Sequence, residues 1–159
     1  MLLVLHRYCV ILVAGLIMIT QGTEIAKGSP MTKPVPLRLH VVFNNVVSKS
    51  DLQSAWGFAC LVEHRDTAIL FDTGGDGHIL LPNMQKLGLN PKEVDTVVLS
   101  HIHRDHTGGL CAFLAENSRI TVYMPESFPS SIKHEIRKFG AETGTVSGAR
   151  ELVTGIHST

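Results

Sequence analysis

The alternation of apolar and polar residues divides the chain beyond residue 36 into short strands and helices. Residues 37–43 alternate as a strand does, and residues 56–63 and 67–71 are β-rich runs joined by a polar turn, which predicts a hairpin. The pattern then predicts a helix at residues 78–87 and a strand buried on both faces at 94–99. Beyond it, the pattern predicts a short helix at 109–115, a strand at 120–124, an amphipathic helix at 130–139 and a strand-and-turn region at 140–159. A hairpin followed by alternating helices and strands predicts an α/β fold.

The N-terminal segment has a different pattern. His6 and Arg7 precede an uninterrupted apolar run over residues 8–19, and a polar stretch with small residues follows the run. This arrangement predicts a signal peptide over residues 1–22, with an uncleaved membrane anchor or a buried helix as alternatives. Residues 23–36 contain several prolines and form a linker, so the folding unit is residues 37–159. We therefore expect an exported protein, periplasmic or secreted, or one held at the membrane by this segment.

Charge and cysteine content narrow the classes of partner. The chain has 14 Lys and Arg residues and 14 Asp and Glu residues, so it presents no net positive field for a phosphate backbone, and we expect no nucleic-acid partner. Of the three cysteines, Cys9 lies in the N-terminal apolar run, and the other two have apolar neighbours. We expect Cys60 and Cys111 to be small core residues and not a disulfide or a thiolate metal site.

The candidate chemistry lies in residues 100–109, here called the ligand loop, which read SHIHRDHTGG and follow the predicted buried strand. In an extended segment residues two apart point to one side, so His101 and His103 are able to hold one cation. The chain then turns, helped by the two glycines, and presents Asp105 and His106 to a second position. The sequence predicts a metal site, and the alternative interpretation is a solvated histidine-rich loop.

The histidines outside the ligand loop are less suited to metal binding. We expect all of them to be solvated or packing residues. They are His40 in a predicted strand, His64 in a polar turn, His78 at the start of a helix, His134 on an exposed helix face and His157 in the C-terminal region. His78 follows the glycine-rich loop of residues 72–77 and is close enough to that loop to contact a substrate.

The ligand loop carries the HxHxDH pattern and resembles the metallo-β-lactamase superfamily. The similarity is greatest to the dihydropterin ribofuranosylaminobenzene phosphate synthase-like subgroup, through residues 56–58, 69–74, 97–101 and 151–156. The resemblance implies that residues 37–159 form the N-terminal part of an αββα sandwich. It also implies a metal-dependent hydrolase that uses a metal-bound hydroxide on a small-molecule substrate.

The resemblance assigns roles to individual residues. It implies a site for two cations, usually Zn²⁺ and sometimes Fe or Mn, with His101 and His103 on the first and Asp105 and His106 on the second. Asp105 would also orient the nucleophile. Asp72 matches a carboxylate that orients ligand histidines by accepting hydrogen bonds from their remaining N–H groups. The alternative interpretation of Asp72 is a plain turn residue before glycines.

The chain also departs from the superfamily pattern. The superfamily uses a third histidine for the first metal, a bridging aspartate and a further histidine, all located later in the chain, and we identify no counterpart in this sequence. The alternatives to an active hydrolase are therefore a truncated, catalytically incompetent homologue with at most weak metal binding, and an exported metal-binding or partner-binding module. With only part of the sandwich, one face of the sheet is expected to stay uncovered and to promote self-association.

Overall fold

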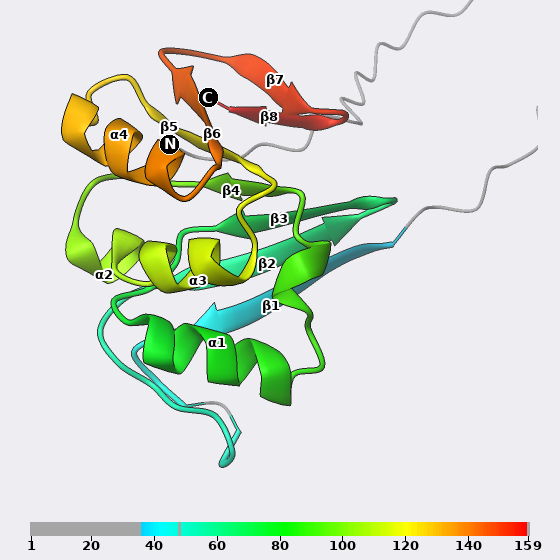
Figure 1. The fold of residues 1–159 in the computed structure, drawn as a ribbon. Helices are drawn as coiled ribbons and strands as arrows, with labels where there is room; N and C mark the ends of the chain where they lie inside the picture. Colours follow the sequence, from blue (N-terminus) through cyan, green and yellow to red (C-terminus); the bar gives the residue numbers. More distant parts are fainter. Residues whose placement is uncertain (1–35, 48, 159) are drawn as a thin grey trace, which may run out of the picture.

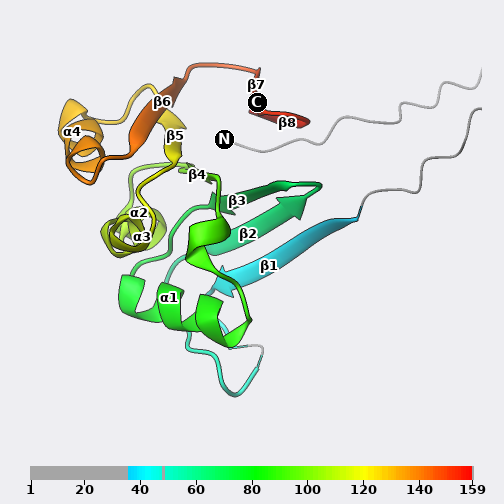
Figure 2. The same ribbon diagram turned by 45° about the vertical axis from the view of Figure 1, so that its right-hand side comes forward.

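The computed structural model describes residues 36–47 and 49–158 (Figure 1). Its centre is a six-stranded sheet with the order β1-β2-β3-β4-β5-β6, in which β1 to β3 pair antiparallel and β3 to β6 pair parallel. The strands are β1 (Leu37–Phe43), β2 (Ala59–His64), β3 (Thr67–Phe71), β4 (Thr96–Val98), β5 (Thr121–Pro125) and β6 (Glu142–Val146). The strands twist progressively from β1 to β6 (Figure 2).

The helices follow the parallel strands, and a small hairpin ends the described chain. The helical elements are α1 (Gly77–Lys86), the 3-10 turn η1 (Pro91–Glu93), α2 (Arg104–Thr107), α3 (Leu110–Glu116) and α4 (Ser130–Lys138). The hairpin consists of β7 (Arg150–Val153) and β8 (Ile156–Ser158) and forms a separate two-stranded sheet. The Asp76 side chain accepts a hydrogen bond from His78 N and caps the first turn of α1, while Gly88, at φ 71°, ends that helix.

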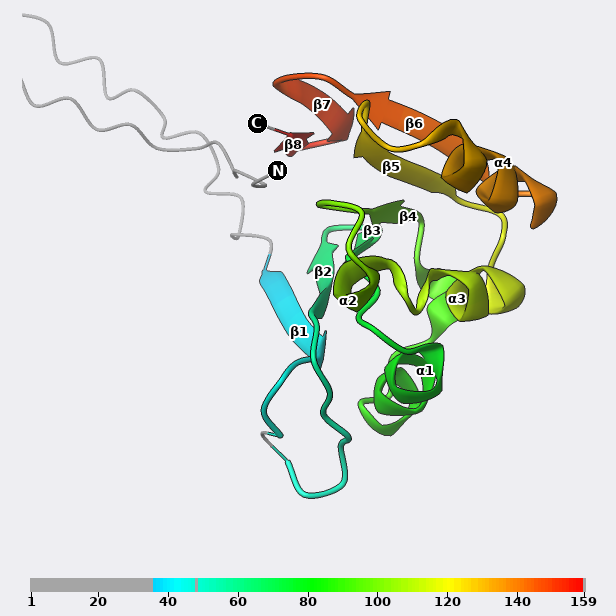
Figure 3. The same ribbon diagram turned by 90° about the vertical axis from the view of Figure 1, so that its left-hand side faces the viewer.

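The two faces of the large sheet are covered by different elements (Figure 3). On one face, Leu61, Leu70, Val97 and Val122 belong to a core that includes the helix residues Leu80, Phe113 and Ile136. On the other face, Ile69 and Val98 pack with the hairpin residues Leu152 and Ile156. Adjacent valines of β4 thus enter different cores, which confirms the prediction of a strand buried on both faces.

The hairpin side of β1 is not covered by the described residues. Leu39 pairs with Val62, which pairs with Ile69, so the register places Leu39 on the face that the hairpin covers elsewhere. The exposed fractions along this row are 41% for Leu37, 62% for Leu39 and 48% for Val41. An apolar row is therefore left in contact with solvent at the edge of the sheet.

The predicted α/β class and element order are confirmed, with local corrections. The strands at residues 37–43 and 67–71 have the predicted bounds, but β2 begins at Ala59 because residues 56–58 are held against the ligand loop. His64 is the last residue of β2 and not part of the turn, which is formed by Arg65 and Asp66. Cys60 is buried, as expected, and its burial raises the pKa of the thiol.

The placement of Cys111 in the core was wrong. Its side chain is exposed, because the buried residues of α3 are Leu110, Phe113 and Leu114, whose spacing defines a different face of the helix. The helical periodicity of this short segment could have shown this, because Cys111 and Phe113 are two residues apart and therefore point to nearly opposite sides of the helix.

The predicted signal peptide or anchor at residues 1–22 and most of the linker at residues 23–36 lie outside the described residues. In the part of the chain that the structure describes, no helix has the length and apolar character needed to cross a membrane.

Candidate metal centre

The ligand loop begins where β4 ends. Leu99 N donates to Tyr123 O over 2.8 Å, so the chain remains attached to β5 until just before Ser100. Residues 100–103 are not helical, and α2 then starts at Arg104, with His106 N and Thr107 N donating to His103 O at 3.0 and 3.1 Å. The change from extended to helical backbone turns the side chains that follow His103 back toward those that precede it.

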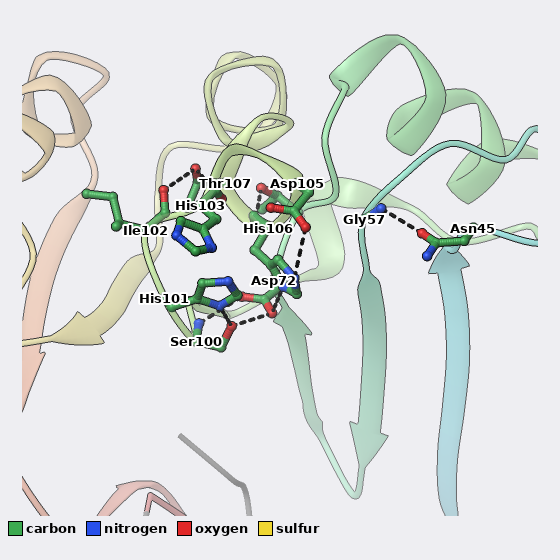
Figure 4. A network of polar contacts seen from close by, with 11 residues as sticks. Asn45, Gly57, Asp72, Ser100, His101, Ile102, His103, Asp105, His106 and Thr107 are labelled. Carbon is green, nitrogen blue, oxygen red and sulfur yellow. Dashed lines mark hydrogen bonds and ion pairs between the residues drawn. The ribbon is translucent and has the colours of Figure 1, made fainter.

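The loop brings its polar side chains together (Figure 4). The ligand atoms of His101, His103 and Asp105 all lie within 4.8 Å of one another. His106 lies beside this group, because its ring centroid is 4.1 Å from that of His101 and its Nε2 is 3.5 Å from Asp105 Oδ2. All four predicted ligands are therefore neighbours. Asp105 is close to each of the other three, to His101 and His103 and also to His106. The division of these four residues between a first and a second cation stays a prediction.

Asp72 connects the loop to the preceding strand. It follows β3 with φ at 56°, its relative exposure is 1%, and its N–H donates to Val98 O over 2.9 Å. Its Oδ1 accepts a hydrogen bond from Ser100 N, and its Oδ2 lies 2.7 Å from both Ser100 Oγ and His106 Nδ1. The carboxylate is fully engaged in these contacts, which is a more specific arrangement than that of an ordinary turn aspartate.

These contacts fix the orientation of two histidine rings. His106 donates its Nδ1 proton to Asp72 Oδ2, which leaves Nε2 as the free nitrogen. Ser100 Oγ donates to the same carboxylate and lies 2.9 Å from His101 Nδ1, so the hydroxyl oxygen accepts the Nδ1 proton of His101. One carboxylate therefore positions two histidines, one directly and one through Ser100. Sequence reasoning gave Ser100 no role, and the one local signal was its position directly before His101 at the end of a predicted strand.

The surroundings of His101 favour the neutral form of its ring. Burial, followed by the nearby His106 and His103 rings, holds the pKa of His101 below its ordinary value. The neutral imidazole is the form that binds a metal ion. Three imidazoles and one carboxylate form a nitrogen and oxygen donor set that fits Zn²⁺ and also accommodates Fe or Mn.

Close backbone contacts set the position of the loop. Phe58 N donates to Asp105 O over 3.2 Å, and both Thr73 N and Thr73 Oγ1 donate to His106 O, at 2.8 and 3.0 Å. Gly57 has φ 137°, and a Cβ atom there would collide with Asp105 O. Sequence reasoning did not identify Gly57 or Thr73 as supports of the ligand loop, because nothing local indicates which distant backbone they approach.

The remaining histidines lie elsewhere. His40 in β1 pairs with Glu63 in β2 over 2.9 Å, and the buried Nδ1 of His64 has no hydrogen-bond partner among the described residues. His78 is exposed on α1, His134 is exposed on α4, and His157 lies in β8. In the described ranges, His101, His103 and Asp105 form the only group of three or more His, Cys, Asp or Glu residues placed to hold a metal ion.

The family model of the metallo-beta-lactamase superfamily matches residues 57–157. This match covers more than half of the chain, and the chain therefore belongs to the metallo-beta-lactamase superfamily. The fold, a mixed α/β structure around a central sheet, agrees with the predicted metallo-β-lactamase class.

Individual relatives agree with this assignment. The chain is 38% identical over 92 residues to the 7,8-dihydropterin-6-methyl-4-(beta-D-ribofuranosyl)-aminobenzene-5'-phosphate synthase of Methanocaldococcus jannaschii, covering 54% of this chain and 31% of that protein. This similarity confirms the predicted resemblance to the synthase-like subgroup. The chain is also 29% identical to the N-acyl homoserine lactonase AiiB of Agrobacterium fabrum, covering 48% of this chain and 35% of the lactonase.

The fold is also similar to solved structures. The metallo-beta-lactamase fold protein YhfI from Bacillus subtilis superimposes with a TM-score of 0.56 at 14% identity, covering 73% of this chain and 50% of that chain. The chain spans about a third of the length of the curated relatives described above.

Proposed function

We propose that this chain acts as part of a metal-dependent hydrolase, with His101, His103, Asp105 and His106 as the ligands contributed by its ligand loop. The observation that carries the proposal is the convergence of His101, His103 and Asp105 within 4.8 Å, supported from behind by the buried Asp72. A solvated histidine-rich loop without a metal would not need a buried carboxylate that orients two of its histidine rings.

When bound, a zinc ion would supply Lewis acidity that polarises the bond to be cut and would lower the pKa of water far enough to provide a hydroxide nucleophile at neutral pH. The chain's own residues have the complementary tasks. Asp72 and Ser100 hold the His106 and His101 rings with Nε2 unprotonated. We propose that the Asp105 carboxylate, which lies within 4.8 Å of the ligand atoms of His101 and His103, would orient the attacking nucleophile. Relatives in the superfamily with hydrolase names, such as the lactonase, support the reaction class.

The substrate that we propose is a small molecule and not a nucleic acid. The equal numbers of acidic and basic residues in the chain support this choice. The synthase name belongs to the Methanocaldococcus protein, and we do not extend its reaction to this chain.

A second candidate function is a metal-binding homologue without turnover. The ligand loop by itself would favour it, because its four donors would give each of two cations only two protein ligands, whereas a zinc ion normally has at least three. In this case the chain would bind about one metal ion weakly and would not accelerate hydrolysis above the buffer rate.

Two double variants test the metal site, and a panel of substrates then separates the two candidate functions. The purified 159-residue chain, the double variant His101→Ala/His103→Ala and the matched double variant His64→Ala/His134→Ala are loaded with Zn²⁺, Fe²⁺ or Mn²⁺ and analysed for metal content. We expect the first double variant to lose metal uptake and the second to retain it. Equal metal content in both would contradict the site. Ester, lactone and phosphodiester substrates then separate a hydrolase from a homologue without turnover.

We also propose that the protein is exported, on the basis of Arg7 and the apolar run that follows it. Cleavage of the signal would give a mature protein that begins at roughly residue 22 to 28, which intact-mass measurement detects. A protein that retains Met1 and is extracted only by detergent would favour the membrane anchor instead.

A further inference from the structure

A pocket lies next to the ligand loop on the side of α1. Its volume is about 450 Å³, and it is lined by Ala55, Trp56, Gly75, Asp76, Ile79, Arg104 and Asp105. Asp105 belongs both to the pocket lining and to the candidate metal group. A molecule in this pocket is therefore adjacent to the residues that we propose as metal ligands.

The pocket presents an aromatic side chain on a fixed backbone. Trp56 is 75% exposed, although an indole usually buries most of its surface. Its neighbours are held firmly, because Gly57 N donates to Asn45 Oδ1 over 2.8 Å (Figure 4). In addition, Phe58 N donates to Asp105 O. The backbone that carries the exposed indole is thus fixed relative to the ligand loop, which suits a ligand-stacking surface.

The same pocket contains a positive charge without an ionic partner. Arg104 is exposed at the start of α2, and its guanidinium forms no hydrogen bond or ion pair with the described residues. The two carboxylates of the pocket are engaged elsewhere: Asp76 accepts from His78 N at the start of α1, and Asp105 faces His106 and the metal group. Since Asp76 is capped by α1 and Asp105 is turned to the metal group, Arg104 is the charged group of this pocket lining that has no polar partner among the described residues.

We propose that Trp56 and Arg104 form a subsite for a flat, anionic group, namely an aromatic ring that carries a carboxylate or a phosphate. The ring stacks on Trp56 above the apolar side chains of Ala55 and Ile79, and the anion pairs with Arg104. That this group belongs to the substrate rests on the proposed hydrolase function, whereas its binding does not require a metal ion.

The chain provides its own reporter for this subsite. Trp56 is the single tryptophan of the sequence, so the intrinsic tryptophan fluorescence reports directly on the pocket. The probes are 4-methylbenzoate, the uncharged 4-methylbenzamide, the non-aromatic 4-methylcyclohexanecarboxylate and phenyl phosphate. We expect saturable fluorescence changes with 4-methylbenzoate or phenyl phosphate, and an affinity about two- to fivefold weaker for the amide, because an ion pair with the exposed Arg104 contributes modestly. The cyclohexane acid tests the requirement for a flat ring and should also bind more weakly.

A variant and a matched control test the role of the arginine. Arg104→Gln is expected to weaken binding of the better anion about two- to fivefold, whereas Arg119→Gln, at the separate surface pocket near residues 118–121, should leave it unchanged. The titration is repeated in the His101→Ala/His103→Ala variant, where binding should persist even if the proposed hydrolase function fails. Equal affinity for acid and amide, the same affinity in Arg104→Gln, or no saturable signal with any anion would overturn the subsite.

Discussion

The ligand loop and β1 differ sharply in how completely their neighbours fix them. Around the ligand loop, Asp72 is 1% exposed and bonded to Ser100 and His106, and backbone from two other segments lies in close contact. Along β1, Leu39 is 62% exposed and its side of the sheet is covered by none of the described elements. The comparison indicates that the structure of the site is determined by dense polar and backbone contacts, whereas the apolar row of β1 is available for a further contact.

The largest expected effect comes from adding one methyl group beside the ligand loop. Gly57→Ala places a Cβ against Asp105 O and also forces a side chain into a positive-φ conformation. We expect it to lower the free energy of unfolding by at least about 3 kcal/mol, through the combined cost of overpacking and backbone strain. Chemical denaturation of the variant and the parent chain measures the loss.

Gly155→Ala is the matched control for that substitution. Gly155 has φ 80°, but no atom lies within 4 Å of the added Cβ, so only the conformational cost of about 1 to 2 kcal/mol applies. Equal losses for the two variants would show that close packing against Asp105 does not stabilise the loop.

A smaller effect is expected from removing the carboxylate that orients the histidines. Asp72→Ala should weaken metal binding about 10- to 100-fold, which is typical for the loss of a group that supports ligands. Asp76→Ala removes a nearby carboxylate that caps α1 but contacts no ligand histidine, and it should leave metal affinity within about twofold. Competition with a chelator of known affinity measures both, and circular dichroism of the metal-free proteins identifies any variant that has not folded. Ser100→Thr, which keeps the hydroxyl, should retain more affinity than Ser100→Ala.

The smallest expected effect on the folded monomer concerns the exposed row of β1. Leu39→Glu with Val41→Glu should change the free energy of unfolding by about 1 kcal/mol or less, because both side chains are already largely exposed. The same variant should reduce the predicted self-association of the chain in sedimentation velocity experiments. Val46→Glu with Val47→Glu, exposed apolar residues outside the sheet, is the control. Unchanged self-association in the β1 variant would exclude this face as the contact surface.

The sequence determined the elements and the chemistry of the site. Residues 67–71 and 37–43 have the pattern of strands and form strands with those bounds, because period-two alternation is a local property of the chain. The four ligand-loop residues were identified because they lie within six residues of the chain, although Asp72 and distant backbone set their final geometry. The superfamily itself was recognised from the same short motif.

Tertiary structure decided everything that depends on which distant segments meet. Ser100 acquires its role only when parallel pairing of β3 and β4 brings the end of one strand beside Asp72 at the end of the other. Trp56 was expected in a strand, but the contact of Phe58 with Asp105 holds this segment at the ligand loop and leaves the indole in a pocket with Arg104. Cys111 was placed in the core from its apolar neighbours, yet the packed face of α3 excludes it. Periodicity specifies local conformation and candidate faces, whereas the partner of each face depends on contacts between residues far apart in the chain.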